Sequence, residues 1–235
     1  MESGDVVVHV EVSDGVGLVR LDDGKANVLS HASLGQIEQA LRDLRESVSA
    51  LVIGGREGIL SGGFDLKVMT AGPREARDLV IRGARLLLDL YTFPVPVVAA
   101  CTGHAIAAGA MLLFVADERI GAEGEFRIGL NEVAAGMPMP RFGMELARDR
   151  LVPPEVPRAV CDARIYAPAE AVHAGFLDET APPDRVWAVA LERARELAGS
   201  LRQPAYRITK ERLRGDRSDA LKAELESDVG ALTGT

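Results

Sequence analysis

The apolar positions near the start of the chain follow a strand pattern and then a helix pattern. Two runs rich in β-branched residues, Val6–Val12 and Val16–Leu21, are parted by Ser13-Asp14-Gly15 and predict a hairpin. From Leu34 to Val48 the apolar residues recur at helical spacing, and Ser30 stands where an N-cap is expected. A hairpin followed by a helix is therefore the first predicted unit.

A unit of buried strand, glycine turn and helix then appears twice. The apolar run Leu51–Gly54 precedes a turn at Gly62-Gly63, and Pro73–Leu90 reads as a helix with proline in its first turn. The run Val97–Ala100 precedes a second glycine turn at 102–111, which leads into a buried helix ending near residue 116. The repetition indicates an α/β fold in which strand ends carry the turns.

The pattern changes toward the end of the chain. A short strand is expected at Arg119–Gly121, a helical piece beginning at Glu132–Ala135, a helix at Ala169–Ala174 that Gly175 stops, and a last strand at Phe176–Thr180. After Pro182-Pro183 only amphipathic, charge-rich helices are expected, and they are Asp184–Leu201, Ala205–Arg214 and Ser218–Leu232. We therefore divide the chain into a core, 1–182, and a helical region, 183–235. That region cannot build a core alone and is expected to pack on another surface, such as a neighbouring subunit.

Composition excludes several classes of function. The chain has 235 residues with a formal net charge of −8 and scattered basic residues, which argues against a nucleic-acid partner. Cys101 and Cys161 form no ligand motif, so neither a metal site nor a disulfide is expected, which fits a cytoplasmic protein. The polar Met1–Asp5 predicts no signal peptide, and the apolar 95–116 is too interrupted to predict a membrane span.

The two glycine turns are the candidate chemistry. Each lies between a strand and a helix, where backbone N–H groups lack partners and the helix dipole favours negative charge. Small residues in both turns allow a ligand to approach the backbone closely. Two such turns can offer two N–H groups to one oxygen and stabilise an oxyanion, an effect of about 3–4 kcal/mol per donor in other enzymes. The alternative is that the glycines serve only tight turns and helix packing.

Three segments together resemble one known family. Ser61–Lys67 (SGGFDLK) and Gly103–Gly109 (GHAIAAG) resemble the two signature turns of the crotonase superfamily, the enoyl-CoA hydratases and isomerases. A third segment, Ile128–Met137, resembles the stretch that carries the family's catalytic glutamate. The resemblance runs from about Val6 to Thr180. It implies a spiral of β-β-α units, and it makes the helical region a trimerisation region of a homotrimer or dimer of trimers.

The resemblance also assigns roles to residues. It implies that the N–H groups of Phe64 and Ala108 bind the carbonyl oxygen of an acyl-CoA thioester, with Glu132 as acid/base. Coenzyme A is then part of the substrate, and no separate cofactor is expected. The residues implied to line the path of the coenzyme A moiety are Lys25, Ala26, Val28, Gly63 and Leu66. A contact between Lys210 and a phosphate of coenzyme A is a further guess.

The family contains two activities, which differ in their carboxyl groups. Hydratases of this family use two glutamates, and the first of these positions is here Met111, which can neither hold nor deprotonate water. Glu132 alone can move a proton between C2 and C4, as in the Δ3,Δ2-enoyl-CoA isomerases, so isomerisation in fatty-acid metabolism is the preferred prediction. A hydratase that recruits a second acid, for example Glu118 or Glu145, is the first alternative. A non-catalytic acyl-CoA-binding protein is the second.

Two further polar residues in the signature turns receive structural predictions. Asp65 is expected to cap a helix. His104 is expected to pack or to make a local hydrogen bond, and it is left out of the catalytic set.

Overall fold

The computed structural model of the chain describes residues 6–233. Its larger sheet has the order β1-β2-β3-β5-β7-β10, in which β1 and β2 form the predicted antiparallel hairpin and every later pairing is parallel. The bounds of its strands are Val8–Ser13 (β1), Val16–Leu21 (β2), Ala50–Gly55 (β3), Val97–Cys101 (β5), Glu118–Ala122 (β7) and Glu179–Ala181 (β10). The parallel strands β3 and β5 are buried throughout, as the continuous apolar runs in the sequence predict.

A second, smaller sheet was not predicted from the sequence. It has the order β4-β6-β8-β9 and consists of Gly58–Ser61 (β4), Gly103–Ile106 (β6), Ile128–Gly129 (β8) and Ile165–Tyr166 (β9). The strands β4, β6 and β8 run parallel to one another, and β9 pairs antiparallel with β8. Runs of two to four residues are too short to show a period in the sequence.

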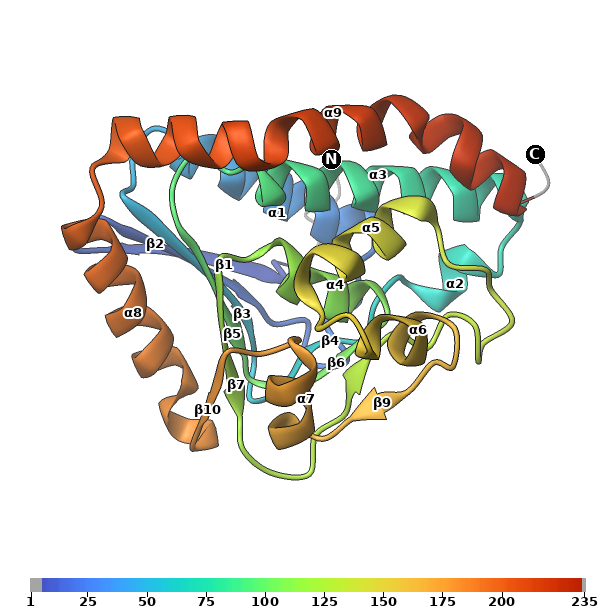
Figure 1. Ribbon diagram of the computed structural model, residues 1–235, viewed down its shortest axis with the longest axis horizontal. Helices are drawn as coiled ribbons and strands as arrows, with labels where there is room; N and C mark the ends of the chain where they lie inside the picture. Colours follow the sequence, from blue (N-terminus) through green and yellow to red (C-terminus); the bar gives the residue numbers. More distant parts are fainter. Residues whose placement is uncertain (1–5, 234–235) are drawn as a thin grey trace.

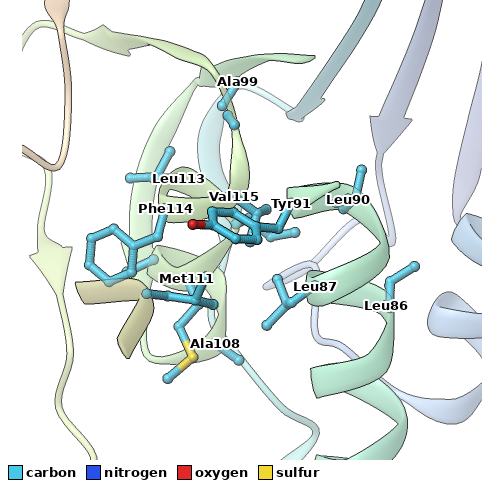
Figure 2. Packing of buried hydrophobic residues seen from close by; sticks show 14 of the residues in the cluster. Leu86, Leu87, Leu90, Tyr91, Ala99, Ala108, Met111, Leu113, Phe114 and Val115 are labelled. Atoms are coloured by element: carbon cyan, nitrogen blue, oxygen red, sulfur yellow. The ribbon is translucent and has the colours of Figure 1, made fainter. Parts of the chain in front are cut away.

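The helices fill the space around the two sheets. Their bounds are His31–Leu44 (α1), Leu66–Met69 (α2), Pro73–Tyr91 (α3), Ala108–Val115 (α4), Arg141–Arg150 (α5), Glu155–Val160 (α6), Pro168–Ala174 (α7), Val186–Ser200 (α8) and Gln203–Thr233 (α9). Ser30 caps α1 as predicted, because its side chain accepts a hydrogen bond from the Ser33 N–H. Part of the core lies where α3 and α4 meet, with Tyr91 beside Val115 and Leu87 on the side of Met111 (Figure 2).

The helical region packs on its own chain. In Figure 1, α8 lies along one face of the larger sheet and α9 runs beside α3 over the opposite side of the molecule. The prediction that these helices need another surface is confirmed, and that surface belongs to the same chain. The division at residue 182 and the homotrimer both stay predictions.

The predicted break between two helices after Arg214 is wrong, because α9 is continuous from Gln203 to Thr233. A glycine inside a helix costs about 1 kcal/mol, which tertiary contacts can offset. Here the residues on both sides of Gly215 are held by α3. Arg214 donates to the Tyr91 carbonyl at 2.9 Å, and the Ser218 hydroxyl donates to the Leu88 carbonyl at 3.5 Å.

Two other element predictions need correction. Residues 132–136 form hydrogen-bonded turns instead of a helix, and the next helix, α5, was not predicted. The last strand begins at Glu179 instead of Phe176. The reason is that the N–H groups of Phe176 and Leu177 donate to the Ala171 carbonyl and close the end of α7, so they are not available to a sheet.

None of the described helices is both long enough and apolar enough to cross a lipid bilayer.

Candidate active site

The three signature segments meet because they follow three neighbouring strands of the smaller sheet. The turn at Gly62-Gly63 follows β4, the turn at Ala107-Ala108 follows β6, and Glu132 comes shortly after β8. Parallel strands end at the same edge of a sheet, and ligands bind there in many α/β proteins. The topology therefore brings together turns that are up to 70 positions apart in the sequence, from Gly62 to Glu132.

The first turn is attached to the loop that precedes α1. The Leu29 N–H donates to the Gly63 carbonyl at 2.8 Å, and the Asp65 N–H donates to the Leu29 carbonyl at 3.2 Å. In a parallel pairing of this kind, the residue between the two bonded positions directs its own N–H to the other side. The N–H of Phe64 therefore points away from Leu29, and the half-buried Phe64 lines the cavity described below.

The second turn ends in the first N–H of α4. The Ala107 N–H donates to the Gly129 carbonyl at 2.9 Å, which ties this turn to β8. Ala107 has φ 54°, a left-handed conformation that alanine rarely adopts, and this directs the chain sharply into α4. Ala108 is the first residue of the helix, so no intrahelical carbonyl accepts from its N–H. That N–H lies at the positive end of the helix dipole.

Glycines let the two turns touch. A Cβ on Gly63 would lie 3.0 Å from the Ala107 Cβ and 3.4 Å from the Ala108 nitrogen. A Cβ on Gly109 would lie 2.2 Å from the Ser61 carbonyl oxygen, so only glycine fits there. The close contact brings the turn that carries the Phe64 N–H against the turn that carries the Ala108 N–H. Two donors to one oxygen must lie close together, and this contact places the two turns side by side; the pairing of the two N–H groups on one oxygen stays a prediction.

Glu132 supplies the carboxyl group of the site. Its side chain is 7% exposed, and its Oε2 atom is buried without a hydrogen-bond partner among the described residues. Burial raises the pKa of Glu132 to about 7, against the weaker opposing effect of a hydrogen bond from its own backbone. The carboxyl group can therefore accept and release a proton near neutral pH, as an acid/base catalyst must.

All three signature segments line one cavity of about 260 Å³. Among the described lining residues, Glu132 is the one carboxylic acid and Asn131 is the other polar side chain. The remaining lining residues are Gly62, Phe64, Leu66, Met69, Val80, Ala107, Met111, Ala135, Met137, Pro138, Pro140, Phe142 and Val229. Met111 lies on α4 one turn after Ala108 and is buried in the core beside Leu87 (Figure 2). It therefore presents a thioether where a carboxyl group would make a second acid.

Of the residues expected along the coenzyme A path, one lines the cavity and the others lie in the adjoining turn and loop. Leu66 lines the cavity, although its side chain is 68% exposed, and Gly63 lies in the adjoining turn. Lys25 is exposed, and Ala26 and Val28 are half-buried in the loop before α1. The Gly62 N–H donates to the Ala26 carbonyl at 2.8 Å, so this loop lies directly against the first turn. Their roles toward coenzyme A stay predictions.

The sequence analysis missed Asn27, which holds this loop in place. Asn27 is buried with φ 49°, and its side-chain amide donates to the carbonyl groups of Leu21 and Leu60 at 3.0 and 3.2 Å. Its own carbonyl accepts from the Ser61 hydroxyl at 2.7 Å. An asparagine in a loop that begins with Asp-Asp-Gly is a turn signal, but its distant partners cannot be read from the sequence.

Two of the other polar residues considered earlier have the structural roles expected of them. Asp65 caps α2 by accepting from the Lys67 N–H at 2.9 Å, as predicted. His104 accepts from the Arg127 N–H at 3.0 Å and packs edge-on against Phe126, so its local hydrogen bond is also confirmed.

The guess that Lys210 meets a phosphate is wrong for this chain. Its side chain is buried, and its ammonium group donates to Asp117 at 2.7 Å. Because Asp117 already neutralises this charge inside the protein, Lys210 is not free to bind an external anion.

The two acids proposed as a second catalytic group lie elsewhere. Glu118 is on β7 and pairs with Arg193, and Glu145 is on α5 and pairs with Arg148 at 2.6 Å. Neither residue lines the cavity. Among the described residues that line the cavity, Glu132 is therefore the one carboxyl group able to transfer a proton.

Comparisons with known proteins show what the whole chain is similar to. The sequence model of the family described as enoyl-CoA hydratase/isomerase matches residues 11–235. The chain is 28% identical over 233 residues to mouse enoyl-CoA delta isomerase 1, mitochondrial, covering 97% of this chain and 80% of the mouse protein. A crystal structure of an enoyl-CoA hydratase/isomerase family protein from Pseudomonas syringae superposes with a TM-score of 0.93 at 38% identity, over 96% of this chain and 98% of that one. The structure of an enoyl-CoA hydratase from Mycobacterium ulcerans gives a TM-score of 0.90 at 41% identity, over 95% and 100%.

Proposed function

The chain belongs to the enoyl-CoA hydratase/isomerase family, and from this membership and the contents of its cavity we propose that it is a Δ3,Δ2-enoyl-CoA isomerase. The thioester carbonyl oxygen of the substrate binds the N–H groups of Phe64 and Ala108. The carboxylate of Glu132 takes a proton from C2, and the electron pair moves into the conjugated enolate, whose charge lies largely on that oxygen. The protonated Glu132 then returns the proton to C4, which leaves the double bond between C2 and C3.

The single carboxyl group in the cavity is the observation that carries this proposal. Isomerisation removes and adds one proton, so one group with a pKa near neutrality is sufficient. Hydration of a double bond also needs a group that holds and activates water. At the position where hydratases of this family have their first glutamate, the cavity presents Met111.

A hydratase is the second candidate, and the names of the relatives favour it as much as an isomerase. The mouse relative is called an isomerase and the Mycobacterium ulcerans structure a hydratase, so the names do not choose between the activities. Against the hydratase stands the pairing of Glu118 and Glu145 with arginines away from the cavity. A non-catalytic acyl-CoA-binding protein is the remaining alternative.

The test compares two reactions in the chain of 235 residues. We expect the wild type to convert a 3-enoyl-CoA to the 2-enoyl-CoA much faster than it hydrates crotonyl-CoA. Its kcat/KM for isomerisation should fall as the pH drops below about 7, because Glu132 must be ionised to take the proton. The variant Glu132→Gln should lose at least about 100-fold in kcat, the usual scale for a general acid/base.

The matched control is Glu145→Gln, which removes a carboxyl group that is ion-paired outside the cavity. This variant should keep both the rate and the pH profile of the wild type. Near-normal isomerisation by Glu132→Gln would remove Glu132 from the mechanism. Faster hydration than isomerisation would favour the hydratase, and binding of acyl-CoA without either product would favour the non-catalytic alternative.

A further inference from the structure

Most of the cavity wall is apolar and could contact a hydrocarbon chain of a ligand. Beyond Glu132 and Asn131 its lining side chains are apolar, and they come from segments far apart in the sequence. Val80 belongs to α3, Phe142 to α5 and Val229 to α9. In an acyl-CoA enzyme such a wall surrounds the acyl chain, since apolar surface is stabilised by leaving water. The residue that ends the cavity then sets the longest chain that fits.

Val229 belongs to the last helix of the polypeptide, α9, and lines the cavity. It is the third residue of an apolar stripe on α9, after Leu221 and Leu225, which are spaced by four and lie on one face of the helix. All three are buried, Val229 to 1% exposure, and α9 lies against α3 along this part of the molecule (Figure 1). Among these three residues, Val229 alone lines the cavity.

Charged contacts fix the turns of α9 that precede Val229. Asp228 accepts from the Arg141 N–H at 2.8 Å, at the start of α5 next to Phe142. Glu226 pairs with Arg85 of α3 at 2.8 Å, and Glu224 pairs with Arg141 at 2.5 Å. Each pair is exposed and individually weak. Together they tie residues 224–228 to the two helices that form the neighbouring parts of the wall, so Val229 forms a fixed surface.

We propose that Val229 is the stop for the acyl chain and so determines the chain length that this protein accepts. This proposal rests on the proposed binding of acyl-CoA in the same cavity. Each methylene group that enters the cavity should tighten binding about 4-fold, the equivalent of burying one CH₂. The gain should end at the chain length whose last carbon reaches Val229, and longer chains should bind no better or more weakly.

The test measures binding of saturated acyl-CoAs of increasing length by isothermal titration calorimetry, which requires no turnover. In Val229→Ala, which lacks two methyl groups, the length at which affinity stops rising should increase by about one or two carbons. In Val229→Phe it should decrease by at least one carbon. Affinity for coenzyme A alone should be the same in both variants and in the wild type.

The matched control is Leu225→Val, one turn earlier on the same face of α9. It removes one buried carbon atom but does not border the cavity, so the limiting chain length should not change. The proposal would be overturned if the limiting acyl chain length were the same in the wild type, Val229→Ala and Val229→Phe. It would also be overturned if a variant changed the affinity for coenzyme A and for every acyl-CoA by the same factor. If the limit shifts as expected but no 3-enoyl-CoA is isomerised, the proposed activity fails and the role of Val229 stands. Failure of every acyl-CoA to bind would overturn both.

Discussion

The buried carboxyl group of Glu132 affects the stability of the protein as well as its chemistry. Its pKa is about 7 in the folded protein, because burial disfavours the charged form, and about 4.5 in a solvated chain. Between these two pH values the folded state holds a proton that the unfolded state has released. The free energy of unfolding therefore decreases as the pH rises from about 4.5 to about 7, and it stays lower above that range. A difference of 2.5 pKa units corresponds to roughly 3 kcal/mol.

The variant Glu132→Gln should lack this pH dependence, because glutamine is neutral at every pH. At pH 8 we expect the variant to be more stable than the wild type by up to about 3 kcal/mol, and at pH 5 the two should be nearly equal. Urea denaturation at both pH values measures the difference, with Glu145→Gln as the control that should show no such pH dependence. If the free energies of unfolding of variant and wild type differed by the same amount at pH 5 and pH 8, burial would not disfavour the charged form of Glu132.

Single residues were predictable from the sequence where a short motif fixes the local geometry. Phe64, Ala108 and Glu132 were assigned from three short segments that resemble motifs of one family, and the structure places these segments after neighbouring strands, while the roles of the three residues stay predictions. The site also contains residues that no local pattern marks. Val229 and Phe142 line the cavity, and they lie 97 and 10 residues from Glu132 in the printed sequence. Their place depends on how α9 and α5 pack, and that is set by contacts between distant parts of the chain.

Among the elements, α9 is held by a buried cluster of charges around Asp117. Its carboxylate accepts from Lys210 at 2.7 Å, from Arg214 at 2.9 Å and from the Val97 N–H at 2.8 Å. Burial alone would raise the pKa of Asp117, but the charges of Lys210 and Arg214 outweigh it and lower the pKa below its usual value. One acid thus connects the middle of α9 to the beginning of β5.

Replacing Asp117 with asparagine should therefore be strongly destabilising. It leaves the cations of Lys210 and Arg214 buried without their counter-charge, a change that costs about 3–5 kcal/mol in other proteins. The control Lys210→Met removes a charge without leaving Asp117 unpaired, since Arg214 remains, and it should cost clearly less. Chemical denaturation of both variants provides the comparison. If both variants lost the same free energy of unfolding, the loss of the Lys210–Asp117 ion pair, and not the cations left without a counter-charge, would explain the destabilisation.

Long elements were predictable and short ones were not, for a physical reason. α1 and α3 each present an apolar stripe over several turns, and β3 and β5 are continuous apolar runs, so their sequences alone reveal them. The strands β4, β6 and β8 have two to four residues and are specified by pairing with one another. The site lies at the ends of these short strands. The sequence therefore indicated that the turns could bind an anion, but it did not reveal the smaller sheet that brings the turns together.

For the whole molecule, the position of the helical region decides which subunit completes the cavity. Because α9 folds back on α3 of its own chain and supplies Val229, a single chain provides all the lining residues described above. A homotrimer, a dimer of trimers and a cytoplasmic location stay predictions. If trimers form, each subunit should carry its own complete acyl wall, and mixing subunits should not create new chain-length preferences.

Shortening the chain separates the two tasks of α9. A protein that ends at Ala220 keeps Lys210, Arg214 and Ser218 on their partners but lacks Leu221, Leu225 and Val229. Each lost aliphatic side chain contributes roughly 1.5–3 kcal/mol when buried. We expect this protein to fold with a free energy of unfolding several kcal/mol lower, and its affinity for acyl-CoAs should keep rising beyond the wild-type limit of chain length.

A protein that ends at Leu201 lacks all of α9 and so loses the cations that neutralise the buried Asp117 as well as the cover over α3. Because a typical domain is stable by only about 5–15 kcal/mol, this loss should prevent folding and lead to aggregation. Soluble yield and thermal denaturation of the two shortened chains, measured beside the full chain, give the comparison. If the chain ending at Leu201 melted at the same temperature as the chain of 235 residues, α9 would be an appendage, and neither the charge cluster nor the acyl wall could have the structural role argued from their contacts.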